Sequence, residues 1–250
     1  MGRSVLEWIG MLLYIVRHAQ SANNALLDQR YRVHDPHLTE LGQRQAEILS
    51  RHLAVGPVRE PVVDASTGNP TPHGPGYGIT RLYCSPMLRA LQTAEPVGRA
   101  LGLAPEVWVD IHECGGVWRD HGENGGIVGY PGIRRQELQD SFPGFSVPNN
   151  LTEEGWWRAG HEEADAWNAR AALVADRLRS WAPCNERIAL ITHGAFSDRL
   201  FHALFGVDGT ERVYYELYNT SISAVDFGRN EQLSLRYLNR VDHLAPPLVT

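Results

Sequence analysis

The chain has 250 residues, of which 43% are hydrophobic and 21% charged, and its net charge is −6 at pH 7. Length and composition fit one sizeable α/β domain, and we treat residues 1–250 as a single domain. The negative balance argues against a general affinity for nucleic acid, so any phosphate site must be a local cationic pocket. The 3 cysteines are widely spaced and odd in number, which argues against a disulfide framework and favours a cytoplasmic location.

The N-terminal segment is apolar from Val5 to Val16 apart from Glu7 and Gly10. It lacks a strongly basic start and a small-residue cleavage site, so we do not assign it as a secretory signal. No apolar run approaches the length of a membrane span, and we expect no membrane partner. Residues 1–10 are expected to form an extension outside the core fold.

In the first half of the chain, an apolar run predicts a buried strand over residues 12–17, and helical spacing predicts a helix over residues 39–54 with Thr39 as its N-cap. Residues 56–78 hold many prolines and glycines and are predicted to be a loop. A second strand is expected over residues 79–84. Ser85 as N-cap and Pro86 in the first turn then predict a helix that runs to about Leu101.

In the second half, residues 115–150 are rich in Gly, Pro and Asn, and we expect them to form a long loop insertion that contacts the substrate. A long helix is predicted over residues 152–181, a strand over 188–192 and a helix over 195–205. Two alternating stretches, 221–227 and 232–238, predict further strands. Strands that alternate with helices predict an α/β three-layer sandwich, a mainly parallel central sheet with helices on both faces.

Two of the predicted strands end directly in a histidine. Residues 12–17 lead into His18, with Arg17 just before it, and residues 188–192 lead into His193-Gly194. Ligands of α/β sheets bind at the carboxyl ends of the strands, and the glycine lets the backbone approach a ligand closely. Two histidines and an arginine at these positions indicate anion chemistry.

Two further charged side chains are candidates for the same site. Arg89 lies in the first turn of the helix after the second strand, where helix N-termini attract anions and an arginine makes a bidentate phosphate contact. Glu113 follows an apolar stretch and precedes Gly115-Gly116, a setting in which a carboxylate can act as general acid. Taken singly, Arg89 is equally compatible with an ordinary surface arginine, and Glu113 is better explained as a solvated loop charge.

Together these motifs resemble the histidine phosphatase superfamily, the phosphoglycerate-mutase-like proteins. The resemblance runs over about residues 12–227 and covers, in order, Arg17-His18-Ala19, Asn24, Leu38-Thr39-Glu40-Leu41-Gly42, the stretch Ser85-Pro86-Met87-Leu88-Arg89-Ala90-Leu91-Gln92-Thr93-Ala94, Glu113, Thr192-His193-Gly194 and Asn219-Thr220-Ser221-Ile222-Ser223.

The resemblance implies a role for each residue. His18 would be the nucleophile that takes the phosphoryl group, and Glu113 would protonate the leaving oxygen and later activate water. Arg17, Asn24, Arg89 and His193, with the backbone at Gly194, would hold the phosphoryl oxygens. It implies no metal ion and no cofactor, because these cations supply the positive charge.

The sequence departs from the family pattern at two positions beside His18. Ala19 replaces the usual glycine, and Gln20 stands where glutamate is usual. The stretch after the acid, Glu113-Cys114-Gly115-Gly116-Val117-Trp118, is nearer to the phosphatase branch than to the mutases. We therefore predict a metal-independent phosphomonoesterase, similar to the histidine acid phosphatases, that forms a phosphohistidine on a small phosphorylated metabolite. Phosphoglycerate-mutase-type transfer stays open as an alternative.

Outside this constellation, Arg119, His121, Tyr130, Arg134 and Arg135 of the insertion are candidates to read the substrate, although solvated loop charge explains most of them equally well. The expected packing residues are Trp156, Trp157, Trp167, Phe201, Leu204 and Phe205, and His243 is expected on the surface.

Two alternatives from other classes are kept. In a metal-dependent hydrolase, His18, His193 and Glu113 would be ligands. In a catalytically weak phosphate-binding regulatory module, Ala19 and Gln20 would mark the lost activity. A homodimer is compatible with the sequence, which does not identify the substrate.

Overall fold

The computed structural model describes residues 10–56, 76–122, 125–184, 186–206, 213–228 and 232–250. Its centre is a six-stranded sheet in the order β3-β2-β6-β1-β7-β8. β1 and β2 pair in parallel with β6, β3 pairs in parallel with β2, and β7 and β8 are added antiparallel. The strands are β1 (Met11–Arg17), β2 (Arg81–Cys84), β3 (Glu106–Val107), β6 (Arg187–Thr192), β7 (Ile222–Phe227) and β8 (Leu233–Arg240).

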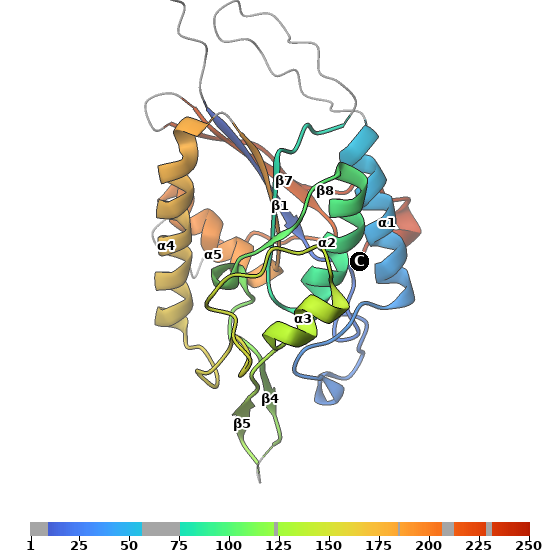
Figure 1. The fold of residues 1–250 in the computed structure, drawn as a ribbon, viewed down its shortest axis with the longest axis vertical. Helices are drawn as coiled ribbons and strands as arrows, with labels where there is room; N and C mark the ends of the chain where they lie inside the picture. The colour runs from blue at the N-terminus through green and yellow to red at the C-terminus, as the bar shows by residue number, and fades with distance from the viewer. Residues whose placement is uncertain (1–9, 57–75, 123–124, 185, 207–212, 229–231) are drawn as a thin grey trace, which may run out of the picture.

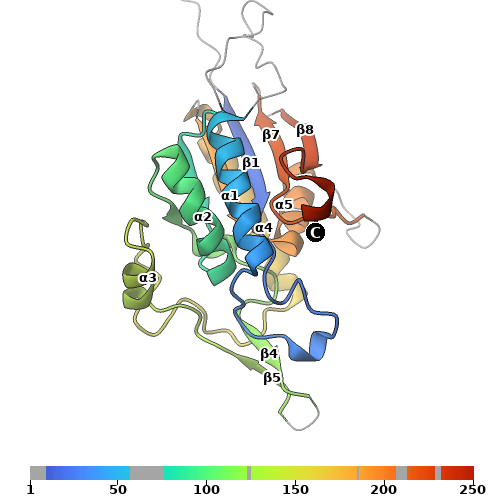
Figure 2. The same cartoon turned by 90° about the vertical axis from the view of Figure 1, so that its right-hand side faces the viewer.

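Helices cover both faces of this sheet, which confirms the predicted three-layer α/β sandwich. α1 (Glu40–Val55) and α2 (Leu88–Leu101) lie side by side on one face, and α4 (Ala164–Trp181) and α5 (Gly194–Phe205) lie on the other (Figures 1 and 2). The alternation of β1 explains the two layers, because successive side chains of a strand point to opposite faces. Tyr14 and Val16 join the core under α1 and α2, whereas Leu13 and Ile15 join the core under α4 and α5.

The insertion over residues 115–150 contains more regular structure than we predicted. It holds a small two-stranded sheet, β4 (Trp118–Asp120) with β5 (Ile127–Gly129), and the short helix α3 (Arg135–Ser141). These elements extend from the end of the molecule at which β1 ends (Figures 1 and 2). Single 3₁₀ turns lie at Gln29–Tyr31, Val109–Ile111, Ala182–Cys184 and Pro246–Leu248.

The helix predicted over residues 152–181 begins later, at Ala164, and this part of the prediction is wrong. Gly155 and Gly160 have φ of +94° and +70°, a backbone conformation that no α-helix contains. The N–H groups of Trp156 and Trp157 both donate to the carbonyl of Pro131. These tryptophans are buried, as expected, but they pack the insertion and do not lie on α4.

The start of α2 and the environment of His243 also differ from the predictions. Ser85 does not cap the helix: α2 begins at Leu88, after an N-cap at Met87 that makes no side-chain bond. His243 is half-buried, since its ring stacks on that of His52 at 5.1 Å and its Nε2 lies 3.1 Å from the Thr220 hydroxyl. Burial and the neighbouring His52 lower the pKa of His243 to about 4.

Some expectations fall outside the described residues, namely the loop over 56–78 for all but its ends and the extension over residues 1–10 for all but Gly10. Among the residues that the structure describes, no helix has the length and apolar character needed to cross a bilayer. Phe201 and Leu204 are core residues of α5, and Phe205 and Trp167 are half-buried.

Arg170 of α4 forms a buried ion pair and also binds the segment that leads to Glu113. The Arg170 guanidinium donates to both carboxylate oxygens of Glu162 and to the carbonyls of Asp110 and His112, at 2.5–2.9 Å. The two side chains are 10% and 7% exposed. Burial opposes ionisation of Glu162, but the bonds and charges of Arg170 and His112 together outweigh it and lower the pKa of Glu162 to about 2.

Removing one member of such a pair leaves an uncompensated buried charge. We expect Glu162→Gln to lower the free energy of unfolding by about 3 kcal/mol, measured by chemical denaturation. The matched control is Glu154→Gln, which breaks the exposed Glu154–Arg158 pair at 3.0 Å and should change stability little. Equal effects of the two substitutions would contradict this account.

Candidate active site

The pairing of β1 with β6 brings the two predicted histidines together. Arg17 is opposite Thr192 in the parallel register, so the next residues, His18 and His193, leave the sheet at the same edge. The His18 N–H donates to the Thr192 carbonyl at 2.8 Å, and the two rings lie 5.0 Å apart. Both side chains are buried, at 2% and 0% exposed.

His18 is oriented with one defined nitrogen toward Arg89. Its Nδ1 lies 2.7 Å from the Ala19 carbonyl, which can only accept, so Nδ1 carries the proton and Nε2 carries the lone pair. Arg89 donates its Nε–H to this Nε2 at 3.1 Å. Burial, Arg89 and Arg17 hold the pKa of His18 well below its ordinary value. The ring is therefore a neutral base with its lone pair in a cationic environment.

His193 and Arg17 each present a polar atom that the protein leaves unpaired. The Nε2 of His193 lies 2.7 Å from the Ser85 hydroxyl, whereas its Nδ1 is buried and has no partner among the described residues. Burial and Arg89 lower the pKa of His193. Arg17 donates one Nη to the Leu217 carbonyl, and its buried Nε has no partner in the same described ranges. Both atoms are suited to an anionic oxygen.

Gly194, the first residue of α5, lies against the guanidinium of Arg17. A Cβ at this position would lie 3.5 Å from the Arg17 Nε, an ordinary contact distance, so the space beside the arginine is limited but not closed. Burial lowers the pKa of Arg17, opposed by the charge of Glu113. The guanidinium is thus a cation held at low solvation, which strengthens its attraction for a phosphate.

Arg89 lies at the N-terminus of α2, as predicted, and its side chain is 10% exposed. Asp35, from the loop between β1 and α1, lies 3.6 Å from its Nη1. The same carboxylate accepts the N–H of Leu88, at 3.1 and 3.3 Å to its two oxygens. Arg89 is therefore fixed between an anion on one side and the His18 ring on the other.

Glu113 lies at the N-terminus of α5. Its Oε1 accepts the N–H groups of Cys114 at 3.0 Å and Phe196 at 2.9 Å, whereas Oε2 accepts one long bond, 3.4 Å, from Ala195. Its charge acts on the guanidinium of Arg17 and on that of Arg89. The carboxylate is anchored through one oxygen, and the other is the oxygen better placed to carry a proton.

Asn24 lies in the loop that follows β1 and is exposed. Its Oδ1 accepts the N–H and the hydroxyl of Ser21, at 3.1 and 2.9 Å, so its amide N–H₂ is the end left to donate. Asn219 lies beside it at 3.5 Å and donates to the His18 carbonyl at 2.8 Å. The structure thus brings all of the predicted site residues to the end of the sheet where β1 and β6 finish.

The two departures beside His18 are accommodated locally. Thr220 and Asn239 are the non-glycine residues with positive φ in the described ranges, so Ala19 has an ordinary backbone conformation and is fully buried. Its N–H donates to Thr93 at 3.1 Å. Gln20 accepts the hydroxyl of Thr39 at 2.7 Å and so contacts the N-cap of α1.

Three residues of the site were missed from the sequence. Ser85 was interpreted as a helix cap but contacts His193, Asp35 was not singled out at all, and Asn219 was noted only as part of a late motif. The motif Asn219-Thr220-Ser221 just before a strand was the available signal, since a polar run at a strand end is typical of a site.

The insertion contacts the loop between β1 and α1 through a ring stack. Tyr130 stacks on His34 at 4.0 Å, with 10° between the planes, and its hydroxyl lies 2.9 Å from His121 Nε2. Arg119 has a buried Nε without a partner in the described part of the chain.

Arg135 is not free to bind a substrate, because its guanidinium donates to the carbonyls of Pro148 and Leu151 at 2.8 and 2.9 Å and so stabilises the insertion. The remaining candidate, Arg134, is exposed at the start of α3.

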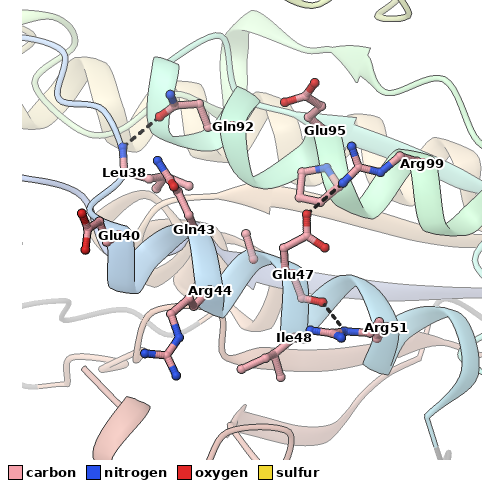
Figure 3. A pocket seen from close by; sticks show the side chains of 12 residues that line it. Leu38, Glu40, Gln43, Arg44, Glu47, Ile48, Arg51, Gln92, Glu95 and Arg99 are labelled. Atoms are coloured by element: carbon pink, nitrogen blue, oxygen red, sulfur yellow. Dashed lines mark hydrogen bonds and ion pairs between the residues drawn. The ribbon is translucent and has the colours of Figure 1, made fainter.

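A separate groove lies between α1 and α2 and contains none of the predicted site residues (Figure 3). It is lined by mixed charges, and an ion pair of 2.8 Å between Glu47 and Arg99 crosses it. At one end Gln92 accepts the N–H of Leu38 at 2.8 Å. These contacts tie the two helices on this face of the sheet together.

Comparison with known proteins identifies the family. Residues 13–64 and 73–240 match the histidine phosphatase superfamily (branch 1), and the chain belongs to this family. It is 26% identical over 239 residues to phosphoserine phosphatase 1 of Hydrogenobacter thermophilus, with 93% of each chain covered. It is 32% identical over 111 residues to the PE-PGRS family protein PE_PGRS11 of Mycobacterium tuberculosis, a match over 44% of this chain and 16% of that protein.

Solved structures share the fold. One is a crystal structure described as a putative alpha-ribazole-5'-P phosphatase from Escherichia coli, with a TM-score of 0.58 and 18% identity over 92% of this chain and 97% of that one. At this identity the likeness concerns the arrangement of sheet and helices. The assignment to the family therefore depends on the sequence match, and the fold agrees with it.

The buried histidines make stability depend on pH. Burial is the main reason that four histidines have lowered pKa values in the folded state, namely His18, His112, His193 and His243. Below about pH 6.5 the unfolded chain therefore binds a proton at each of them, whereas the folded protein binds it only at lower pH. Asp35 acts in the opposite direction. Burial raises its pKa to about 6, so as the pH falls the folded protein binds a proton there before the unfolded chain does.

We therefore expect the free energy of unfolding to fall between pH 7.5 and 5.5, by roughly 1.4 kcal/mol over the whole interval for each histidine that stays neutral in the fold. Urea denaturation followed by tryptophan fluorescence at the two pH values measures the change. Equal or greater stability at the lower pH would show that the histidines are protonated in the folded protein.

Proposed function

We propose that this protein is a phosphatase that hydrolyses phosphomonoesters through a phosphohistidine on His18, without a metal ion. The observation that supports it most is the orientation of His18, whose Nδ1 is held by the Ala19 carbonyl and whose Nε2 lone pair faces Arg89. A neutral imidazole with a fixed tautomer is a competent nucleophile. The phosphatase name of the relative from Hydrogenobacter agrees with this reading.

In the first step, Nε2 of His18 attacks phosphorus in line while the bond to the leaving oxygen breaks. The unpaired Nε of Arg17 and Nδ1 of His193, together with Arg89, would contact the equatorial oxygens and the charge that develops on them. Arg89 would exchange its bond to His18 for one to a phosphoryl oxygen. Glu113 would donate a proton from Oε2 to the leaving alkoxide.

In the second step, Glu113 takes a proton from water, and the hydroxide attacks phosphorus as the bond to Nε2 breaks. The products are inorganic phosphate and free His18, and the proton count is restored. Attack of an alcohol in place of water on the phosphohistidine, with Glu113 taking the proton of that alcohol, reverses the first step and is mutase-type transfer. We favour hydrolysis because the stretch after Glu113 is nearer to the phosphatase branch.

A metal-dependent hydrolase has less support. In the described ranges no three His, Cys, Asp or Glu side chains come together as metal ligands, and Nε2 of His18 and Nε2 of His193 face Arg89 and Ser85, respectively. Activity that survives excess chelator separates the two functions. We further propose that the substrate is a small phosphorylated metabolite and that the protein acts in the cytoplasm. We expect no nucleic-acid or membrane partner, and a homodimer is compatible with this function.

The nucleophile is tested by trapping. Rapid quenching with a labelled phosphomonoester should give one acid-labile, base-stable phosphohistidine, and His18→Ala should give none and lose at least about a thousandfold in kcat. Exposed His37 supplies the matched control, since His37→Ala should trap label normally. Label on His193 would reverse the roles of the two histidines.

The role of Glu113 is tested by the leaving group. A general acid matters for a poor alkoxide and little for an activated phenolate. We expect Glu113→Gln to slow an alkyl phosphate by about a hundredfold and p-nitrophenyl phosphate far less, measured as kcat for both. A loss of the same size on both substrates would mean that the bonds of Glu113 to α5, and not its proton, are what matters.

A further inference from the structure

Asp35 occupies a position in the site that the reaction described above does not use. It comes from the loop between β1 and α1, and its side chain is 10% exposed. Its two oxygens lie 3.1 and 3.3 Å from the N–H of Leu88, the first residue of α2, and Oδ1 lies 3.6 Å from Nη1 of Arg89. One carboxylate therefore contacts both the start of the helix and the arginine on it.

The start of α2 needs such a partner. Its N-cap, Met87, makes no side-chain hydrogen bond to the helix, and the N–H of Leu88, at the positive end of the helix dipole, donates to Asp35 instead. An anion from a different part of the chain thus replaces the missing cap. This contact fixes the backbone from which Arg89 extends.

Arg89 needs an anion as well. Its guanidinium is buried, and its Nε donates to His18 Nε2 at 3.1 Å. Its cationic neighbours Arg17 and Arg32 disfavour its charge, and Asp35 is the first anion that supports it, ahead of Glu113. A buried arginine without such a partner would be free to turn away from the ring.

We infer that Asp35 is a positioning residue for phosphoryl transfer, holding Arg89 in the orientation that serves both His18 and the phosphoryl oxygens; this inference rests on the function proposed above. Asp35 itself does not contact the His18 ring, so it acts through Arg89. Its negative charge also limits how strongly Arg89 binds a phosphate. Loss of that charge should therefore affect turnover more than substrate binding.

The charge of Asp35 is poised to change near neutral pH. Burial raises its pKa to about 6, and Arg89 and the Leu88 N–H lower it only in part. The charged groups that face it are Arg89 from α2 and Glu137 from α3, and the latter raises its pKa further. The ionised form that pairs with Arg89 thus predominates above pH 6 and is lost as the pH falls below it.

The experiment compares wild type with Asp35→Asn, using p-nitrophenyl phosphate. The amide still accepts the N–H of Leu88 but carries no charge, so capping is retained and only the ion pair is lost. We expect kcat at pH 7.5 to fall at least about tenfold, with KM unchanged or lower. The control is Asp28→Asn, which removes a carboxylate of the same loop that pairs with the exposed Arg30 at 2.7 Å and should leave kcat unchanged.

The pH dependence separates positioning from a purely structural role. Because wild-type Asp35 is itself neutral at low pH, the ratio of wild-type to variant kcat should shrink toward one between pH 7.5 and 5, and ionisation of the substrate cancels in this ratio. An unchanged kcat in Asp35→Asn, or a ratio that is constant with pH, would overturn the inference.

A measurement on the wild type covers the case in which the variant does not fold. The ¹⁵N resonance of Arg89 Nε should titrate with a midpoint near pH 6, the pKa of Asp35. This signal does not depend on turnover. If wild type hydrolyses no phosphomonoester, the proposed function fails while the titration still tests the pair; an Arg89 resonance that does not move between pH 5 and 7.5 overturns the inference in either case.

Discussion

The parallel pairing of β1 with β6 is the constraint from which the site follows. It sets Arg17 opposite Thr192, so the two residues that come next, His18 and His193, leave the sheet beside each other. A slip of β1 by one residue against β6 would turn the side chain of His18 to the other face of the sheet and separate it from His193. Buried apolar side chains on both faces of β1 make that slip costly, so the stability of the sandwich and the geometry of the pocket have the same origin.

Electrostatics then determines what this edge of the sheet can bind. Two buried guanidinium groups and two imidazoles with lowered pKa form a pocket that is cationic without being protonated at the histidines. The chain as a whole is acidic, at −6, so this charge is local and oriented. Asp35 and Glu113 balance it from two sides. A pocket of this kind favours a small, multiply charged oxyanion over a diffuse polyanion.

Much of this could be predicted from the sequence, because its signals are local. An apolar run that ends in histidine identifies a strand and its ligand-binding end, and Thr39 caps α1 as its position predicts. The errors occur where the backbone conformation or a partner remote in the chain decides the structure. The helix predicted from residue 152 ignored positive φ at Gly155 and Gly160, and Ser85 was assigned to a cap because its distant partner, His193, is not visible in the chain order. Asp35 was missed for the same reason, since a carboxylate that caps a helix from another loop leaves no pattern in either segment.

The ring stack between Tyr130 and His34 has a consequence for how relatives of this protein can diverge. His34 is the residue before Asp35, so the insertion is attached by its tyrosine to the loop that supports Arg89. An insertion exchanged for that of another member of the family would have to keep a flat ring opposite position 34, or the exchange would disturb the loop that supports Arg89. In a chimera, a change made in the insertion therefore reaches the contacts of Arg89 as well.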